Sequence, residues 1–179
     1  MITLEPPLTD KDVEKLEVGD SVKISGRIIT ARDEAYERIL EFIEEGKNLP
    51  VDLENGVVYH CGPLVEKREE GWNIVSAGPT TSGRLDEVQA DFVKKTGTKV
   101  LIGKGGVGKK VVPEISSMNC VYLSFTGGAA ALAADSIESI EDVFWKDLGL
   151  PEALWVLKVE EFGPLTVSVD KSGRNLYHE

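Results

Sequence analysis

The sequence predicts an α/β fold built around a central parallel sheet, and the middle of the chain carries the main evidence. Three times in succession, an apolar strand candidate is followed by a glycine-bearing loop and then by a helix candidate. This alternation is typical of parallel sheets with crossover helices. The three units are a strand over 72–77 with a helix over 85–95, a strand over 99–102 with a helix ending near 117, and a strand over 120–125 with a helix ending near 134.

The elements before this region follow from local patterns. Thr9 and Asp12 have the spacing of a capping box that opens a short helix. Apolar residues alternate over 21–30, which predicts a strand. Helical spacing of apolar residues over 33–45 predicts an amphipathic helix, and 57–61 is the next strand candidate.

After Asp135 the pattern changes to short extended pieces over 143–145, 154–159 and 165–170. These pieces predict additional strands of mixed direction beside the central strand–loop–helix units. The chain contains no internal repeat and no linker, and 179 residues are enough to bury a substantial core. We therefore expect residues 1–179 to form a single domain.

The charge balance limits the classes of partner. The formal net charge is −11, whereas binding to a nucleic-acid backbone requires a basic surface. A small anionic ligand would need local basic groups within this acidic surface. The longest apolar runs are too short to cross a bilayer, and the first residues lack the features of a signal peptide, so we expect a cytoplasmic protein.

The chain has only two cysteines, Cys61 and Cys120. Two are too few for a disulfide scaffold or for the three or four thiolates that an iron–sulfur cluster takes. We expect both to be buried apolar residues. His60 and His178 show neither metal-ligand spacing nor a partner for nucleophilic catalysis, and no metal site is predicted in this chain.

The loop over 78–84 is the first candidate for chemistry. Five of its seven residues are Gly, Thr or Ser, and it leads into a predicted helix. Backbone N–H groups and hydroxyls at a helix N-terminus can bind an anion, and Arg84 adds a planar set of donors suited to a carboxylate. The structural alternative is a polar connection in which Ser82 caps the helix and Arg84 is a surface charge.

The loop over 103–110 resembles a P-loop, because Gly103, Gly108 and Lys109 satisfy the G-x-x-x-x-G-K spacing. However, Lys110 stands where a Ser or Thr would hold Mg²⁺. A loop that places Lys104 or Lys109 beside a smaller anion explains the same residues better than a nucleotide site does. Nucleotide binding stays open as an alternative.

Two further features are less specific. Thr126-Gly127-Gly128 precedes an alanine-rich helix, and small residues of this kind favour close packing over ligand contact. Arg32 lies between a predicted strand and a predicted helix, where its positive charge opposes the helix dipole. Its position suggests an anion-binding role.

Together these segments resemble the β subunit, or C-terminal domain, of class I fumarases and L-tartrate dehydratases. The string Ala-Gly-Pro-Thr-Thr-Ser-Gly-Arg over 77–84 is the most specific match. The matching segments follow the family's order over nearly the whole chain and comprise 7–9, 26–33 ending in Thr-Ala-Arg-Asp, 76–86, 102–105 and 127–131.

The resemblance implies a swivelling β/β/α domain that pairs with an α subunit carrying a 4Fe-4S cluster, in a hetero-oligomer without membrane or nucleic acid. The implied reaction is reversible hydration of a dicarboxylate, with fumarate to L-malate favoured and L-tartrate dehydration as the alternative. One iron of the partner's cluster would act as a Lewis acid. The residues that match the family's substrate-binding positions are Arg32, Thr80, Thr81, Ser82, Gly83, Arg84 and Lys104, of which Thr80 also matches the threonine associated with proton transfer.

Three classes of function therefore remain open: the hydro-lyase subunit, a P-loop-like nucleotide-binding domain, and a non-catalytic interaction domain. A dianionic substrate needs a cationic group at each end, and holding both ends orients the carbon that loses its proton. A threonine hydroxyl is a weak base, so a role for Thr80 in proton transfer depends on an activating neighbour.

Overall fold

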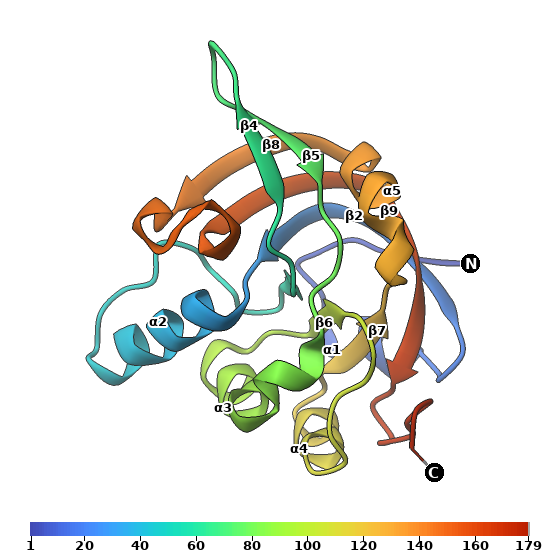
Figure 1. Cartoon of the computed structure of the whole chain (residues 1–179). Helices are drawn as coiled ribbons and strands as arrows, with labels where there is room; N and C mark the ends of the chain where they lie inside the picture. The colour runs from blue at the N-terminus through green and yellow to red at the C-terminus, as the bar shows by residue number, and fades with distance from the viewer. Residues whose placement is uncertain (179) are drawn as a thin grey trace.

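The computed structural model describes residues 1–178 and contains a mixed sheet with the strand order β1-β2-β3-β6-β7-β9-β8. Strand β2 also pairs with β9, so that β2, β3, β6, β7 and β9 close into a barrel (Figure 1). Strands β1, β2, β3, β6 and β7 run parallel, whereas β9 is antiparallel to β2, β7 and β8. The strands are β1 (Ile2–Leu4), β2 (Ser21–Thr30), β3 (Val57–Tyr59), β6 (Val100–Gly103), β7 (Val121–Ser124), β8 (Ile137–Phe144) and β9 (Leu154–Val169).

Helices α2, α3 and α4 pack on the outside of the parallel strands (Figure 1). Four 3₁₀ turns, η1 to η4, complete the elements, and none of the helices within residues 1–178 has both the length and the apolar character that a bilayer crossing requires. The helices are α1 (Asp10–Glu14), α2 (Asp33–Glu44), α3 (Asp86–Thr96), α4 (Val111–Ser117) and α5 (Ala130–Asp135), and the turns are η1 (Ser82–Leu85), η2 (Gly127–Ala129), η3 (Lys146–Leu148) and η4 (Leu150–Glu152).

Alternation along the strands separates two hydrophobic clusters. Val57 and Tyr59 of β3 belong to the cluster that fills the barrel. Val58 lies on the opposite face of the strand and belongs to the cluster under the helices. Because strand side chains alternate with period two, each of the parallel barrel strands β2, β3, β6 and β7 contributes to both clusters. The site loops are thereby attached to strands that are buried on both faces.

The prediction was wrong for the first of the three strand–loop–helix units, because its strand is not part of the central sheet. Residues 72–76 form β5 (Trp72–Ser76), which pairs antiparallel with β4 (Leu64–Lys67) in a separate two-stranded sheet. This hairpin projects from the barrel in Figure 1. Trp72 and Ile74 pack against the barrel cluster while Val75 is exposed, so the segment is a half-buried ribbon and not a central strand.

The C-terminal strands are longer than the sequence predicts. The extended pieces at 154–159 and 165–170 belong to one 16-residue strand, β9, and β8 begins six residues before the predicted piece at 143–145. Strand β9 passes through Glu161 and Gly163, which have φ values of 49° and 145°. In the sequence this irregular region looks like the end of one strand and the start of another. In the structure β2 pairs with β9 on both sides of it.

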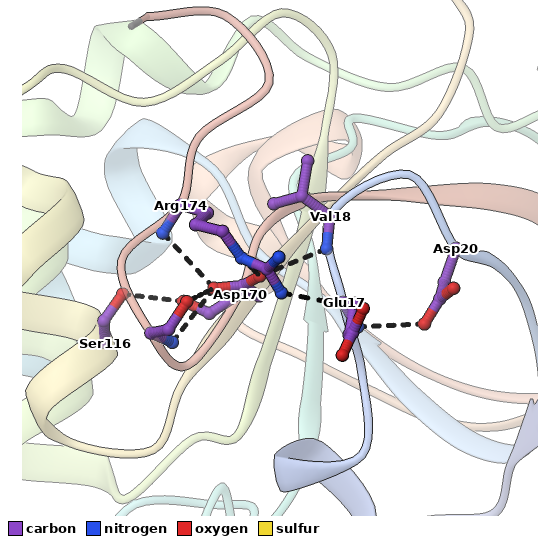
Figure 2. Close-up of polar contacts among 7 residues, drawn as sticks. Glu17, Val18, Asp20, Ser116, Asp170 and Arg174 are labelled. Atoms are coloured by element: carbon purple, nitrogen blue, oxygen red, sulfur yellow. Dashed lines mark hydrogen bonds and ion pairs between the residues drawn. The ribbon is translucent and has the colours of Figure 1, made fainter.

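The carboxylate of Asp170 fixes the turn that follows β9. It is 1% exposed and accepts hydrogen bonds from the backbone N–H groups of Val18, Ser172 and Arg174, as well as from the Ser172 hydroxyl and Arg174 Nε (Figure 2). The Ser116 hydroxyl donates to the backbone carbonyl of Asp170. The α1–β2 connection, α4 and the C-terminal segment are thus joined at one residue.

Burial by itself raises the pKa of the Asp170 carboxyl, but the hydrogen bonds from Ser172, Val18 and Arg174 outweigh it and hold the pKa below its usual value. A carboxyl with a lowered pKa in the folded state stabilises the fold above its unfolded pKa, and this stabilisation is lost as the pH falls through the folded pKa. We expect Asp170→Asn to lower the free energy of unfolding by about 1.5–3 kcal/mol at pH 7. Below pH 4 the difference from the parent should shrink.

Urea unfolding of both proteins from pH 7 to pH 3 measures this effect. Asp20→Asn is the matched control, because the Asp20 carboxylate accepts a hydrogen bond from Glu17 N at the protein surface (Figure 2). Asp20→Asn should lower the free energy of unfolding clearly less than Asp170→Asn does. A pH-independent difference for Asp170→Asn would contradict the electrostatic account.

Candidate functional site

The predicted site loops meet at one edge of the barrel, beyond the carboxyl ends of the parallel strands. Arg32 follows β2, His60 follows β3 and Lys104 follows β6. The loop that contains Thr80 crosses this edge: Thr80 N donates to His60 O at 2.7 Å, and Lys104 N donates to Thr80 O at 3.1 Å. This is the edge at which ligands bind in parallel α/β sheets.

The carboxylate of Asp33 joins Arg32 and Arg84. The Oδ2 atom of Asp33 accepts from Arg84 Nη2 at 2.9 Å and from Arg32 Nε at 3.4 Å. Glu152 of η4 lies 2.9 Å from Arg32 Nε. Arg32 is 23% exposed and Arg84 is 52% exposed, so both guanidinium groups border solvent. The sequence predicted the two arginines but not their acidic partners Asp33 and Glu152.

The close approach of Arg32 to the loop after β3 depends on a glycine. A Cβ atom on Gly62 would lie 2.6 Å from Arg32 Nη1 and 3.1 Å from Pro151 Cβ. Any side chain at position 62 would push the guanidinium away. Gly62 therefore sets the path of Arg32 across this edge of the barrel.

Lys104 is the third basic group at this edge. Thr81 pairs with it in an isolated parallel bridge, and Ser82 N donates to Lys104 O at 3.3 Å. The Lys104 side chain is exposed and borders an open cavity of about 480 Å³ that Thr81, Ser124 and Tyr177 also line. Thr80 is partly exposed, and its backbone N–H and carbonyl are both paired in the crossing loop.

A buried chain of hydrogen bonds lies behind these loops. His60 is fully buried, with Nε2 2.5 Å from the Tyr36 hydroxyl and Nδ1 2.7 Å from Ser82 Oγ. The Tyr122 hydroxyl donates to the same Ser82 Oγ at 2.9 Å. Burial lowers the pKa of His60 to about 3, so the imidazole is neutral at physiological pH. These hydrogen bonds link α2, η1, β7 and the residue after β3 through uncharged groups.

Ser82 therefore differs from its neighbours in the loop. Its hydroxyl is buried in this network and does not cap the following helix, whereas Thr81, Gly83 and Arg84 are exposed. Its carbonyl accepts from Gln89 Nε2 at 2.9 Å. The backbone N–H of Ser82 donates to Lys104 O, while its hydroxyl is bonded to buried residues. Ser82 therefore fixes the conformation of the loop from its buried side.

Sequence reasoning missed Tyr36, His60 and Tyr122 as members of the site. His60 directly follows a strand, which is the one local signal that could have pointed to it. Tyr36 and Tyr122 lie on a predicted helix and a predicted strand, where they read as ordinary core residues. Asp33 was missed although it directly follows Arg32, which was predicted as a site residue. Nothing near Glu152 in the sequence indicates a contact with Arg32.

The P-loop-like segment does not form an open phosphate cradle. A Cβ atom on Gly108 would lie 2.5 Å from an Asp86 carboxylate oxygen, and one on Gly106 would lie 2.8 Å from the Tyr177 ring. The loop is thus packed against an acidic side chain and against the C-terminal segment. A carboxylate beside the glycine opposes the binding of a polyphosphate.

The residues present do not fit an iron–sulfur cluster in this chain. Cys61 belongs to the barrel cluster and Cys120 to the cluster under the helices. Burial raises the pKa of each thiol to about 12, so both are protonated. Within residues 1–178, no three His, Cys, Asp or Glu side chains are grouped so that they could hold a metal ion.

The sequence of this chain is similar to those of known proteins over most of its length. The family model described as Fumarase C-terminus matches residues 1–179. The chain is 44% identical over 173 residues to a Methanocaldococcus jannaschii protein provisionally named L(+)-tartrate dehydratase subunit beta, with 96% of this chain and 89% of that one covered. It is 39% identical over 176 residues to L(+)-tartrate dehydratase subunit beta of Escherichia coli, with 98% and 86% covered.

A third relative is a longer protein. The chain is 40% identical over 180 residues to a Geobacillus stearothermophilus protein provisionally named class I fumarate hydratase, and the match covers 100% of this chain but 34% of that protein. The same sequence unit thus occurs as a separate subunit and as part of a larger chain. With a family model that spans its full length and relatives this similar, the chain belongs to the Fumarase C-terminus family.

Proposed function

We propose that this chain is the β subunit of an iron–sulfur hydro-lyase that adds water to, or removes it from, a dicarboxylate. The observation that carries the proposal is the set of three basic residues, Arg32, Arg84 and Lys104, at one edge of the barrel in an otherwise acidic protein. Family membership supports the reaction class. The proposal includes a single swivelling β/β/α domain over 1–179.

In this proposal the basic residues bind the substrate carboxylates, and each interaction strengthens as negative charge develops next to the carbon that loses its proton. Thr81 and Gly83 line the same loop, and Ser82 supports it from the buried side. Thr80 takes part in proton transfer. Because a threonine hydroxyl is a weak base, this role needs an activating neighbour.

The cluster belongs to a separate α subunit in this proposal, in a hetero-oligomer located in the cytoplasm. Two relatives carry the words subunit beta in their names, which supports a partner chain. When bound, the 4Fe-4S cluster would supply a Lewis-acidic iron. The two free, buried cysteines suit a reducing compartment.

Fumarate hydration to L-malate is the favoured reaction, and L(+)-tartrate dehydration is the second candidate. The second has a specific observation in its favour, because the subunit-sized relatives are named after tartrate dehydratase. The provisionally named fumarate hydratase supports the first. The contacts that discriminate between these substrates would be shared with the α subunit.

Co-expression of this chain with its α subunit tests the proposal. We expect the chain alone to be colourless and inactive, and the anaerobically purified complex to be brown and to convert fumarate or L(+)-tartrate. Spectroscopy from 300 to 600 nm and a coupled assay with each substrate measure the two properties. A stable cluster band from the isolated chain, or a cluster-loaded complex inactive on every dicarboxylate, would overturn the assignment.

A further inference from the structure

One carboxylate oxygen joins the two arginines of the candidate site. Asp33 Oδ2 accepts from Arg84 Nη2 at 2.9 Å and from Arg32 Nε at 3.4 Å. Arg32 precedes Asp33 directly, whereas Arg84 comes from the η1 turn that begins after the crossing loop. Within residues 1–178, Asp33 makes the only ion pair of Arg84.

Arg32 has a second acidic partner. Glu152 Oε1 lies 2.9 Å from Arg32 Nε, and Glu152 Oε2 accepts from Glu34 N at 3.1 Å. Glu152 is therefore itself tied to the first turn of α2. Loss of Asp33 would leave Arg32 with this contact but would leave Arg84 without an ion pair.

Electrostatics explains why acidic groups are needed here. Two guanidinium groups at this edge repel each other, and the positive charge of Arg32 at the N-cap of α2 also opposes the helix dipole. Asp33 occupies the first turn of the 12-residue helix, where a carboxylate is favoured. Asp33 thus lowers the repulsion between the two guanidinium groups, with Glu152 as a second acidic partner of Arg32.

We propose that Asp33 is a positioning residue that couples Arg32 and Arg84 into one carboxylate-binding unit and acts on turnover mainly through Arg84. This inference rests on the proposed function. We assign Asp33 a positioning role because its Oδ2 atom contacts both guanidinium groups. Its effect is to hold Arg84, which is half exposed, in the orientation that a substrate carboxylate requires.

A double-mutant cycle in the co-expressed complex tests the coupling. Asp33→Asn keeps the shape of the side chain but removes its charge, and we expect it to lower kcat/KM about tenfold, as the weakening of one charge-assisted hydrogen bond does. In an Arg84→Ala background the same substitution should cost less than about twofold, because the residue through which it acts is gone. Asp33→Glu should recover part of the loss.

Asp147→Asn is the matched control. Asp147 accepts two hydrogen bonds, at 3.0 and 2.8 Å, from Arg38, which lies on α2 like Asp33. Asp147 itself lies outside the site. It should leave kcat/KM unchanged. The pH profile of Asp33→Asn should have the parent's shape, since a positioning residue transfers no proton.

The possible outcomes separate this inference from the proposed function. If the parent complex is active and the losses from Asp33→Asn and Arg84→Ala simply add, the coupling is wrong although the function stands. Loss of a limb of the pH profile in Asp33→Asn would also overturn it, in favour of a direct role in proton transfer. A cluster-loaded parent complex that is inactive on all dicarboxylates would instead reject the function.

Discussion

Arg84→Lys and Lys104→Met should each lower kcat/KM of the assembled complex ten- to a hundredfold. Lysine keeps the charge of Arg84 but lacks the planar pair of donors that binds a carboxylate in two places. Methionine keeps most of the bulk of Lys104 without its charge. A charge-assisted hydrogen bond contributes about 1.5–3 kcal/mol, which corresponds to losses of this size. A loss in kcat as well as in KM would mean that the contact strengthens in the transition state.

Folding should be almost unaffected by these two substitutions. Arg84 is 52% exposed and Lys104 is exposed, and the surface ion pair of Arg84 with Asp33 contributes little to stability. Lys109→Ala is the control, because Lys109 is an exposed lysine of the same loop, whereas the backbone bond to Thr80 is made by Lys104. If both variant complexes assemble normally and turn over like the parent, Arg84 and Lys104 do not bind the substrate.

The elements with strong local patterns were predictable. Strand β2 occupies the predicted residues 21–30, and the capping box at Thr9 is present, with the Asp12 carboxylate accepting from Thr9 N at 2.8 Å. Closure of the barrel was not predictable in this way. It depends on the pairing of β2 with β9, which joins segments more than 120 residues apart. Side-chain periodicity shows which face of a strand is buried but not which strand lies next to it.

The same difference holds for the candidate site. Arg32, Lys104 and the loop over 80–84 could be singled out because each carries its own donors and lies after a predicted strand. Asp33 and Glu152 were missed because an acidic residue on a surface helix or turn is ordinary until its partner is known. Their role depends on side-chain distances across the fold, which no spacing in the sequence encodes.

The buried network behind the site was missed for a related reason, and one glycine exposes its importance. Gly103 ends β6 directly before Lys104. A Cβ atom at this position would overlap Ser82 Oγ and would lie 3.0 Å from the Tyr122 hydroxyl and 3.1 Å from His60 Nδ1. The backbone of β6 thus approaches the centre of the network as closely as a residue without a side chain allows.

We expect Gly103→Ala to have the largest effect of a single methyl group in this chain. Overpacking a buried site costs about 1–3 kcal/mol, and each buried polar group that loses its partner costs roughly 1–3 kcal/mol more. Displacement of the Ser82 turn also moves Arg84 and Lys104, and an error of ~1 Å in such groups can cost about a hundredfold in rate. Thermal unfolding and the kcat/KM of the folded complex measure the two effects.

Gly128→Ala is the control for the added methyl group, since a Cβ atom there would contact nothing within 4 Å. A second variant keeps the test decisive if Gly103→Ala folds poorly. In Gly103→Ala/Ser82→Ala the new methyl group can take the volume of the deleted hydroxyl, so this double variant should be more stable than Gly103→Ala alone, although His60 and Tyr122 then lack their partner. The Ser82 network does not hold the site loops in place if the double variant is the less stable of the two. The same conclusion follows if Gly103→Ala behaves like Gly128→Ala.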